Sequence, residues 1–469
     1  MPMIWAALMA AAVPYRAALI VGVSVGFDGG APLQFADDDA ARYFELLSTR
    51  VDEARILTVL DPDSQKLFPD VASVAGAPTL LALDESLSEL KTRAELARSD
   101  GKRTELLFVY VGHGRVRGGE GEVKLLDGSV ERHALHEKVL AAKSFDRVHV
   151  IVDACSAYHF VNARGDEDVD RAFESFLTSE TLGAHPTAGA ALATSGEGPT
   201  HEWSEIRGGL FSHEVRSGLL GAADADVDGL VTYYELEAFL AAANLGVPAP
   251  LGRPRVWVRA PAVELHAALA PTVRSGPAVS FEADVEGHFL VIDDRGLRHA
   301  ELHREPGRVG RVTLDARRSY VVVGPTGRVV ARSKAGESVH VSSSATDFGE
   351  WRHERGTESL PAIFAEPFGQ RFLGGYAAGL ATISDSSVSA PYPWLSWVAF
   401  GVGVVALSGS VWQGIQATSE HTRYLEAHDG DERDRLAESV ATKRGWAVGL
   451  GLTAGLGLVT GIVSLVAEP

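Results

Sequence analysis

Apolar residues in the N-terminal half of the chain occur in short blocks that alternate with amphipathic stretches. Two of these stretches, residues 38–50 and 78–99, have apolar side chains at helical spacing. Five apolar runs have the length and β-rich composition of buried strands: residues 17–23, 54–60, 105–111, 147–152 and 188–194. Strands that alternate with helices predict an α/β fold, with a parallel-dominated sheet and helices on both of its faces.

The pattern changes after about residue 253, where apolar and polar residues alternate in short segments between glycine-containing turns. This alternation predicts a small antiparallel β-domain at residues 276–345. A linker is expected at residues 346–393, and its last part is rich in Gly, Ser and Pro.

Two uncharged stretches near the C-terminus, residues 394–415 and 445–467, are long enough to cross a bilayer as helices of about 20 residues. Tryptophans lie at their ends, as is typical of membrane interfaces. The sequence therefore predicts two transmembrane helices that anchor the protein in a lipid bilayer; the alternative is a pair of buried helices in a water-soluble domain. Lys443 and Arg444 predict a cytoplasmic loop between the two helices. The large N-terminal region would then lie on the extracytoplasmic, periplasmic side.

The apolar N-terminus agrees with that orientation. Residues 1–16 have the apolar run and small residues of a short signal peptide, with cleavage after Ala12. Basic residues that usually open a signal peptide are missing, apart from the α-amine. The alternatives are a wrongly chosen start codon and an apolar N-terminal strand.

Net charge and cysteine content limit the kinds of partner and of active site that this chain can have. The formal net charge of −19 argues against a nucleic-acid partner, since phosphate binding needs clustered lysine and arginine. The chain has one cysteine, Cys155, which excludes an internal disulfide and a zinc site built from several cysteines. Any thiol chemistry therefore depends on Cys155.

Chemically active residues follow two of the predicted strands. The run 105–111 is followed by His113 and Gly114, and the run 147–152 by Asp153 and Cys155. Because parallel strands present their carboxyl ends at one edge of the sheet, we expect His113 and Cys155 to emerge side by side. An imidazole is the usual base for a thiol nucleophile.

In this interpretation Cys155 attacks a carbonyl, and His113 holds the thiol proton and then gives it to the leaving amine. The backbone N–H groups at Gly114 and Cys155 would face the developing oxyanion. Taken singly, Cys155 also fits a small buried apolar residue, and His113 also fits a structural histidine.

A strand ending in His-Gly, followed by a strand ending in Asp-x-Cys, resembles the caspase/metacaspase superfamily of cysteine peptidases. The runs LIVGVSVG, LQFADDDAARYFELL, ATSGEG and GGLFSHEVRSGL extend this resemblance over residues 17–245. It implies a caspase-like peptidase domain at residues 17–260, with His113 and Cys155 as the catalytic dyad. The chain departs from the metacaspase pattern after the cysteine, where it has Ser156-Ala157-Tyr158 in place of His-Ser-Gly.

The resemblance also implies a substrate pocket. Asp153 and Asp39 match two acids that line the metacaspase specificity pocket, with Asp38 as the alternative register for the second. Two carboxylates would favour a substrate with Arg or Lys before the cleaved bond. The alternative role of Asp39 is that of a helix N-cap.

A second motif lies at residues 224–235, with the sequence DADVDGLVTYYE. It has the spacing of an EF-hand calcium loop, in which carboxylates recur at alternate positions and a glycine permits the sharp turn at Gly229. The predicted Ca²⁺ ligands are Asp224, Asp226, Asp228, the Leu230 carbonyl, Thr232 and Glu235. The alternative is an Asp-rich turn that joins two helices without a metal.

The sequence thus predicts a cysteine endopeptidase that acts on a peptide or protein substrate. The dyad chemistry needs no cofactor, and calcium is expected only in the 224–235 loop. The alternative function is a catalytically silent caspase-like module, either a membrane-tethered scaffold or a calcium sensor. The presence of both His113 and Cys155 favours the enzyme.

Overall fold

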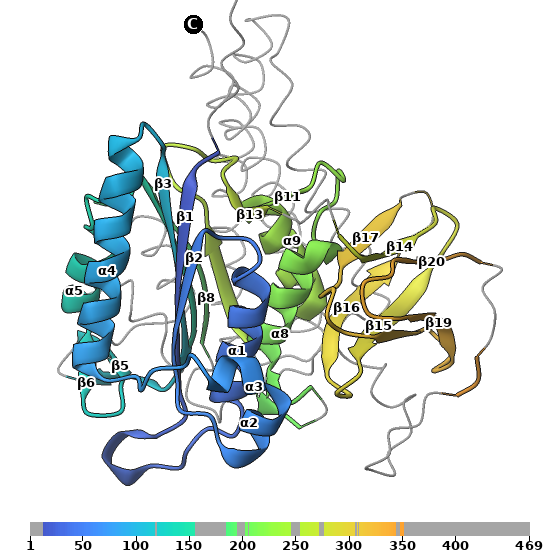
Figure 1. Ribbon diagram of the computed structural model, residues 1–469, viewed down its shortest axis with the longest axis horizontal. Coiled ribbons are helices and arrows are strands. Elements are labelled where there is room, and N and C mark those ends of the chain that lie inside the picture. Colours follow the sequence, from blue (N-terminus) through green and yellow to red (C-terminus); the bar gives the residue numbers. More distant parts are fainter. Residues whose placement is uncertain are drawn as a thin grey trace, which may run out of the picture. The chain divides into compact units, whose positions relative to one another are not determined.

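The computed structural model describes residues 13–117, 120–154, 184–194, 202–204, 206–244, 254–271, 276–304, 307, 309–343 and 348–350. This part of the chain contains a six-stranded sheet with the strand order β12-β8-β7-β3-β1-β2 (Figure 1). Its strands are β1 (Tyr15–Val23), β2 (Glu53–Leu57), β3 (Thr104–Gly112), β7 (Arg147–Ala154), β8 (Ala188–Thr194) and β12 (Arg255–Arg259). All neighbouring pairs are parallel except β12 with β8. The predicted α/β fold with a parallel-dominated sheet is confirmed.

Successive side chains of β1 point to opposite faces of the sheet, and both faces are covered by helices. Ala18 and Ile20 belong to one hydrophobic core, and Leu19 and Val21 belong to another. The first core is closed by α1 (Ala36–Leu47), α8 (Leu210–Ser217) and α9 (Tyr233–Asn244), and the second by α4 (Leu80–Ser99) and α5 (Arg132–Leu135). Figure 1 shows these two groups of helices on opposite sides of the strands.

Short elements connect these layers. Three small antiparallel sheets are formed by β4 (Gly114–Arg117), β5 (Glu120–Lys124) and β6 (Ser129–Glu131), by β9 (Glu202–Trp203) and β10 (Gly208–Gly209), and by β11 (Leu230–Thr232) and β13 (Ala268–Pro271). The other helical segments among the described residues are η1 (Phe27–Gly29), α2 (Pro62–Leu67), α3 (Pro69–Ala72), η2 (His136–Leu140) and η4 (Gly218–Ala222).

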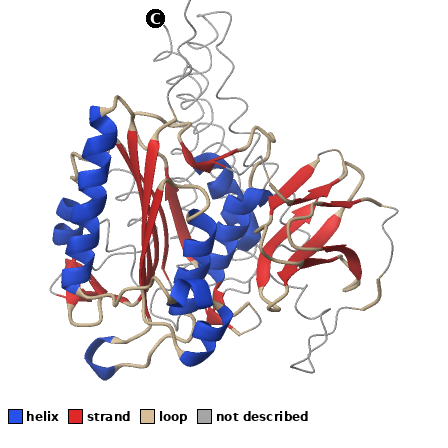
Figure 2. Cartoon of the chain, viewed as in Figure 1, coloured by secondary structure: helices blue, strands red, loops and turns tan. Residues whose placement is uncertain are grey.

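The described residues after Gly276 form strands and no helices (Figure 2). One sheet has the order β17-β14-β20 and the other β16-β15-β18-β19. The strands are β14 (Ala278–Phe281), β15 (Gly287–Asp293), β16 (Arg298–Arg304), β17 (Gly310–Thr313), β18 (Tyr320–Val323), β19 (Val329–Ser333) and β20 (Val339–Val341). Pairing is antiparallel except between β14 and β20. We call this region the β-domain; its strands lie within the predicted range 276–345.

The prediction of two transmembrane helices as part of the fold is corrected. Among the described residues, no helix is long and apolar enough to cross a membrane. The helix α4 has 20 residues, but charged side chains such as Asp84, Glu89 and Arg93 make it amphipathic. The segments 394–415 and 445–467 lie outside the described residues, as do residues 1–12 of the predicted signal peptide and nearly all of the linker.

Candidate functional site

The residues of the predicted dyad follow the ends of β3 and β7 in the sequence. These strands are parallel neighbours, and their last paired residues are Gly112 and Ala154. His113 is therefore the first residue beyond β3. Cys155 comes directly after Ala154 in the sequence and lies outside the described residues.

His113 is partly buried under the segment that follows β1. Burial lowers the pKa of His113, and the nearby main chain of Ala31 and Ser24 partly opposes this shift. The Nε2 atom is buried and has no hydrogen-bond partner within the described part of the chain. A neutral imidazole with an unengaged ring nitrogen has what a general base requires.

The main chain at His113 is held firmly. Its carbonyl oxygen accepts hydrogen bonds from the Lys124 N–H at 3.0 Å and from the Tyr110 hydroxyl at 2.8 Å. Gly114 opens β4 and is paired with Val123. His113, the candidate base, therefore connects the buried strand β3 to the small antiparallel sheet, and Gly114, the candidate oxyanion donor, is the first residue of that sheet.

The two predicted pocket acids lie close together. Asp153 Oδ2 accepts hydrogen bonds from the Ser212 hydroxyl at 2.6 Å and the Ser212 N–H at 3.2 Å. A Cβ atom placed on Gly209 would lie 2.8 Å from Asp153 Oδ2 and 3.3 Å from Asp39 Oδ2. Both carboxylates thus face the same glycine, which leaves no room for a side chain there. Burial, together with the charge of Asp39, raises the pKa of Asp153 to about 6.

Asp39 already has a cationic partner. Its carboxylate forms an ion pair with Arg216 Nη1 at 2.6 Å and accepts the Gly209 N–H at 2.6 Å. Both side chains of this ion pair are almost completely buried. The N-cap of α1 is Phe35, and Asp39 lies one turn inside the helix, so the alternative role of Asp39 as N-cap is wrong.

The neighbouring acids have partners of their own. Asp38 accepts the Ser64 hydroxyl at 2.7 Å and pairs with Arg207 at 3.3 Å, and Asp37 accepts the Asp61 N–H at 3.0 Å. All three acids of the first turn of α1 are buried. This position favours them, because the N-terminal end of a helix carries partial positive charge.

Sequence reasoning missed three residues that organise this site. Arg216 and Ser212 of α8 bind the two pocket acids, and Glu202 of β9 accepts the N–H groups of Gln34 and Phe35 at 2.9 and 2.8 Å. The run GGLFSHEVRSGL indicated the helix, but nothing in its pattern distinguished Arg216 from a surface arginine.

The predicted calcium loop forms the turn between η4 and α9. Carboxylate oxygens of Asp224, Asp226 and Glu235 lie within 4.8 Å of one another. Gly229 has φ +82°, the left-handed conformation that the motif requires. Asp224 Oδ1 is buried without a hydrogen-bond partner, and burial and the charge of Glu235 raise the pKa of Asp224 to about 6.

The rest of the loop is arranged as follows. Asp228 accepts the Leu230 N–H at 2.7 Å, and Thr232 donates its hydroxyl to Glu235 at 2.8 Å. The short strand β11 within the loop pairs with β13. Three converging carboxylates with an unsatisfied oxygen fit a hard divalent cation such as Ca²⁺.

Comparison with protein-family models and with curated proteins finds no match. Among solved structures, protein GSU0716 from Geobacter sulfurreducens has 14% sequence identity and a TM-score of 0.32, and the match covers 56% of this chain and 100% of that one. A structure titled pro-sf-caspase-1 has 11% identity and a TM-score of 0.33, and the match covers 53% of this chain and 92% of that one. At these scores the resemblance to a caspase fold is weak and carries no argument.

Proposed function

We propose that the chain is a caspase-like cysteine endopeptidase with Cys155 as nucleophile and His113 as general base. The observation that supports this most is the register of β3 and β7. Because Gly112 and Ala154 are paired, the residues that follow them leave neighbouring strands at the same edge of the sheet. A thiol and an imidazole at those two positions are the parts of a nucleophile–base pair.

The proposed reaction uses only groups of the chain and water. The Cys155 thiol gives its proton to His113, and the thiolate attacks the carbonyl carbon of the peptide bond. The C–N bond breaks as His113 protonates the leaving amine, and a thioester remains on Cys155. Water, deprotonated by His113, then releases the acid and restores the thiol. The N–H groups of Gly114 and Cys155 would stabilise the negative oxygen in both steps.

We infer a preference for Arg or Lys before the cleaved bond. Asp39 and Asp153 supply two carboxylates that both face Gly209, and Asp153 precedes the proposed nucleophile by two residues in the sequence. Arg216 already neutralises Asp39, so a substrate cation would have to share or displace this guanidinium. The preference therefore depends on how the 2.6 Å Asp39–Arg216 pair responds to a peptide.

Calcium is proposed as a structural ligand of the 224–235 loop. Asp224, Asp226 and Glu235 would hold it, with the carbonyl of Leu230, Asp228 and Thr232 completing the oxygen shell. Bound calcium would offset the mutual repulsion of these carboxylates. No step of the thiol chemistry needs it.

One observation favours the second candidate function, a catalytically silent caspase-like scaffold or calcium sensor. The pocket acids Asp39 and Asp153 both have protein partners, Arg216 and Ser212. A site whose recognition groups are occupied internally fits a module that has no peptide substrate.

Peptide hydrolysis tests the two candidates. The full-length chain would be assayed with fluorogenic peptides that end in Arg, Lys or Asp, beside the variants Cys155→Ala and His113→Ala. We expect cleavage after Arg or Lys that both substitutions abolish, with the same activity in calcium and in a chelator if calcium is only structural. Absence of cleavage, together with absence of labelling of Cys155 by an arginyl chloromethyl ketone, would favour the silent module.

A further inference from the structure

A cavity of about 370 Å³ lies between the helices α1 and α8 and the loops of the β-domain. Its apolar lining comes from both regions: Leu46, Leu220, Pro277, Leu297, Leu314 and Tyr320. Small-molecule sites usually enclose about 300–1,000 Å³, with mostly apolar walls and a few convergent polar groups. This cavity has the size and the walls of such a site.

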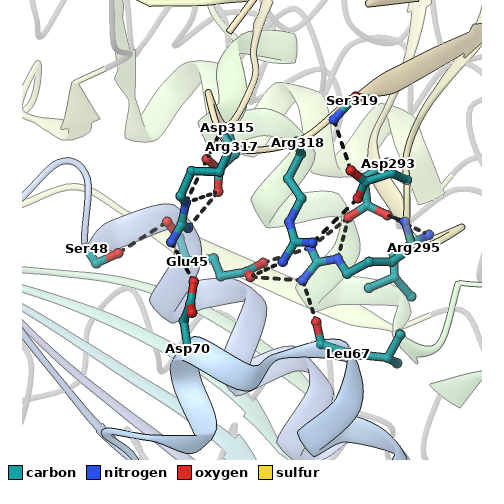
Figure 3. Close-up of polar contacts among 12 residues, drawn as sticks. Glu45, Ser48, Leu67, Asp70, Asp293, Arg295, Asp315, Arg317, Arg318 and Ser319 are labelled. Carbon is teal, nitrogen blue, oxygen red and sulfur yellow. Dashed lines mark hydrogen bonds and ion pairs between the residues drawn. The ribbon is translucent and has the colours of Figure 1, made fainter. Parts of the chain in front are cut away.

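Positive charge dominates its polar lining. Six arginines line the cavity but only three carboxylates, those of Glu45, Asp293 and Asp315. All three carboxylates are paired with arginines: Arg295 pairs with Glu45 at 2.9 Å and with Asp293 at 2.7 Å, and Arg317 pairs with Asp315 at 2.7 Å (Figure 3). Two of the other lining arginines have counter-ions outside the lining, since Arg216 pairs with Asp39 at 2.6 Å and Arg298 pairs with Glu301 at 3.3 Å.

Arg42 and Arg216 have buried N–H groups without a hydrogen-bond partner among the described residues. Arg42 is 7% exposed and Arg216 is 3% exposed. Arg42 Nη1 donates to the Ile206 carbonyl at 2.8 Å, whereas its Nε and Nη2 have no partner among the described residues. Arg216 uses Nη1 for Asp39, and its Nη2 is likewise unpartnered there.

Such an arrangement is unfavourable without a ligand. A buried charged donor that lacks an acceptor has given up its hydrogen bonds to water without gaining others. Burial, together with the charge of Arg216, lowers the pKa of Arg42 to about 10, and the nearby carboxylates of Asp39, Asp38 and Asp293 oppose only part of this shift. An anion that accepted hydrogen bonds from both guanidinium groups would remove this cost.

We propose that this cavity binds a small organic anion, with a carboxylate or phosphate head on an apolar body. Arg42 and Arg216 would hold the head, and the leucine side chains would contact the body. Inorganic phosphate alone would leave the apolar walls unfilled, and a neutral apolar molecule would leave the guanidinium groups unpaired.

Binding to the full-length chain can be measured by isothermal titration calorimetry. The probes are phenyl phosphate and benzoate, which carry the two kinds of head on the same ring. Phenol serves as the body alone and inorganic phosphate as the head alone. We expect at least one organic anion to bind roughly tenfold more tightly than both controls, a difference of about 1.4 kcal/mol. The stronger of the two distinguishes a phosphate site from a carboxylate site.

Two variants test whether binding occurs in this cavity. Arg42→Gln removes the charge, and Ala316→Trp fills the mouth, where Ala316 is exposed and its replacement leaves the core intact. Each should weaken binding by roughly tenfold or more. The control is Arg55→Gln, which changes an exposed arginine that pairs with Glu53 and Glu89 and does not line the cavity.

The proposal is overturned if neither organic anion binds more tightly than its two controls. It is also overturned if binding is unchanged in Ala316→Trp with a wild-type circular dichroism spectrum. The second variant decides the matter if Arg42→Gln does not fold. None of these outcomes depends on peptidase activity. The binding experiment therefore tests the cavity independently of the proposed function.

Discussion

Two clusters of acidic residues in this chain differ in whether arginine side chains neutralise them. At the start of α1, Asp38 and Asp39 face Arg207 and Arg216, which form ion pairs with them. In the 224–235 loop, no lysine or arginine forms an ion pair with the carboxylates within the described residues, and Asp224 keeps an unpartnered oxygen. The first cluster is neutralised by arginines of the chain itself, whereas the second has carboxylates that can bind a metal cation.

The difference shows that carboxylate spacing alone does not define a cation site. Both clusters are visible in the sequence as runs of aspartate. What separates them is whether arginines from distant segments fold onto them, since a paired carboxylate has little free energy left to offer an external cation. Four predictions test this contrast.

The largest effect is expected for the buried pair. Arg216→Gln would leave Asp39 buried without its counter-ion, and breaking such a pair costs about 3–5 kcal/mol of the free energy of unfolding. Urea-induced unfolding of the full-length chain measures it. The double variant Asp39→Asn/Arg216→Gln should recover much of the loss, because no isolated charge remains. The matched control Arg55→Gln, at an exposed pair, should cost less than about 1 kcal/mol. A loss in Arg216→Gln as small as in this control would show that the first cluster does not depend on its cation.

The second prediction concerns calcium. At a concentration one hundred times its Kd, Ca²⁺ should stabilise the folded chain by about 2.7 kcal/mol, seen as a higher unfolding temperature in scanning calorimetry. Glu235→Gln should abolish this response, because it removes a carboxylate of the converging group. Glu237→Gln is the matched control: it is the same change on the same helix, at an exposed residue outside the loop. An undiminished response in Glu235→Gln would place calcium elsewhere.

The sequence predicted the sheet because its strands are long, apolar and separated by turn residues. The run 188–194 matches β8, and the runs that precede His113 and Cys155 in the sequence match two neighbouring parallel strands, β3 and β7. The edge strand β12 escaped prediction because RVWVR is short and has an arginine at each end. The periodicity of apolar residues is a local signal. It can therefore locate the helices and strands and the edge of the sheet at which the parallel strands end.

The partners of the site could not be predicted in the same way. Arg216 and Asp39 are 177 residues apart, and their contact depends on how α8 packs beside α1. Likewise, nothing in DADVDGLVTYYE shows that its short strand pairs with β13 rather than with a second loop of the same kind. Arginines that neutralise a predicted acidic pocket are visible only once the chain is folded.

The third prediction uses pH to reveal the unpaired cluster. The pKa of Asp224 is raised to about 6 from an ordinary value of 3.8, so the folded chain binds more protons than the unfolded chain between these values. Stability without calcium should therefore fall as the pH rises through this window. Asp224→Asn removes the effect and should make the calcium-free chain about 1 kcal/mol more stable at pH 7, since the half-exposed site is partly screened by solvent. The gain should vanish below about pH 4. Urea unfolding with chelator at pH 4 and pH 7 measures it, and a loss of stability at pH 7 would contradict the cluster's mutual repulsion.

The smallest effect is expected at the outer cation of the first cluster. Arg207 is 39% exposed at its side chain and lies 3.3 Å from Asp38, so Arg207→Ala should cost only about 0.5–1 kcal/mol. Arg207 also has φ +48°, a left-handed conformation that costs a non-glycine residue roughly 1–2 kcal/mol. Arg207→Gly should therefore be about 0.5–1 kcal/mol more stable than Arg207→Ala, after the greater flexibility of glycine in the unfolded chain is subtracted. Chemical unfolding of the two variants isolates the backbone strain from the ion pair.

If Arg207→Gly were the less stable of the two, the strain would be offset locally. If both variants lost as much as Arg216→Gln, the neutrality of the cluster would depend on its exposed arginine as strongly as on its buried one.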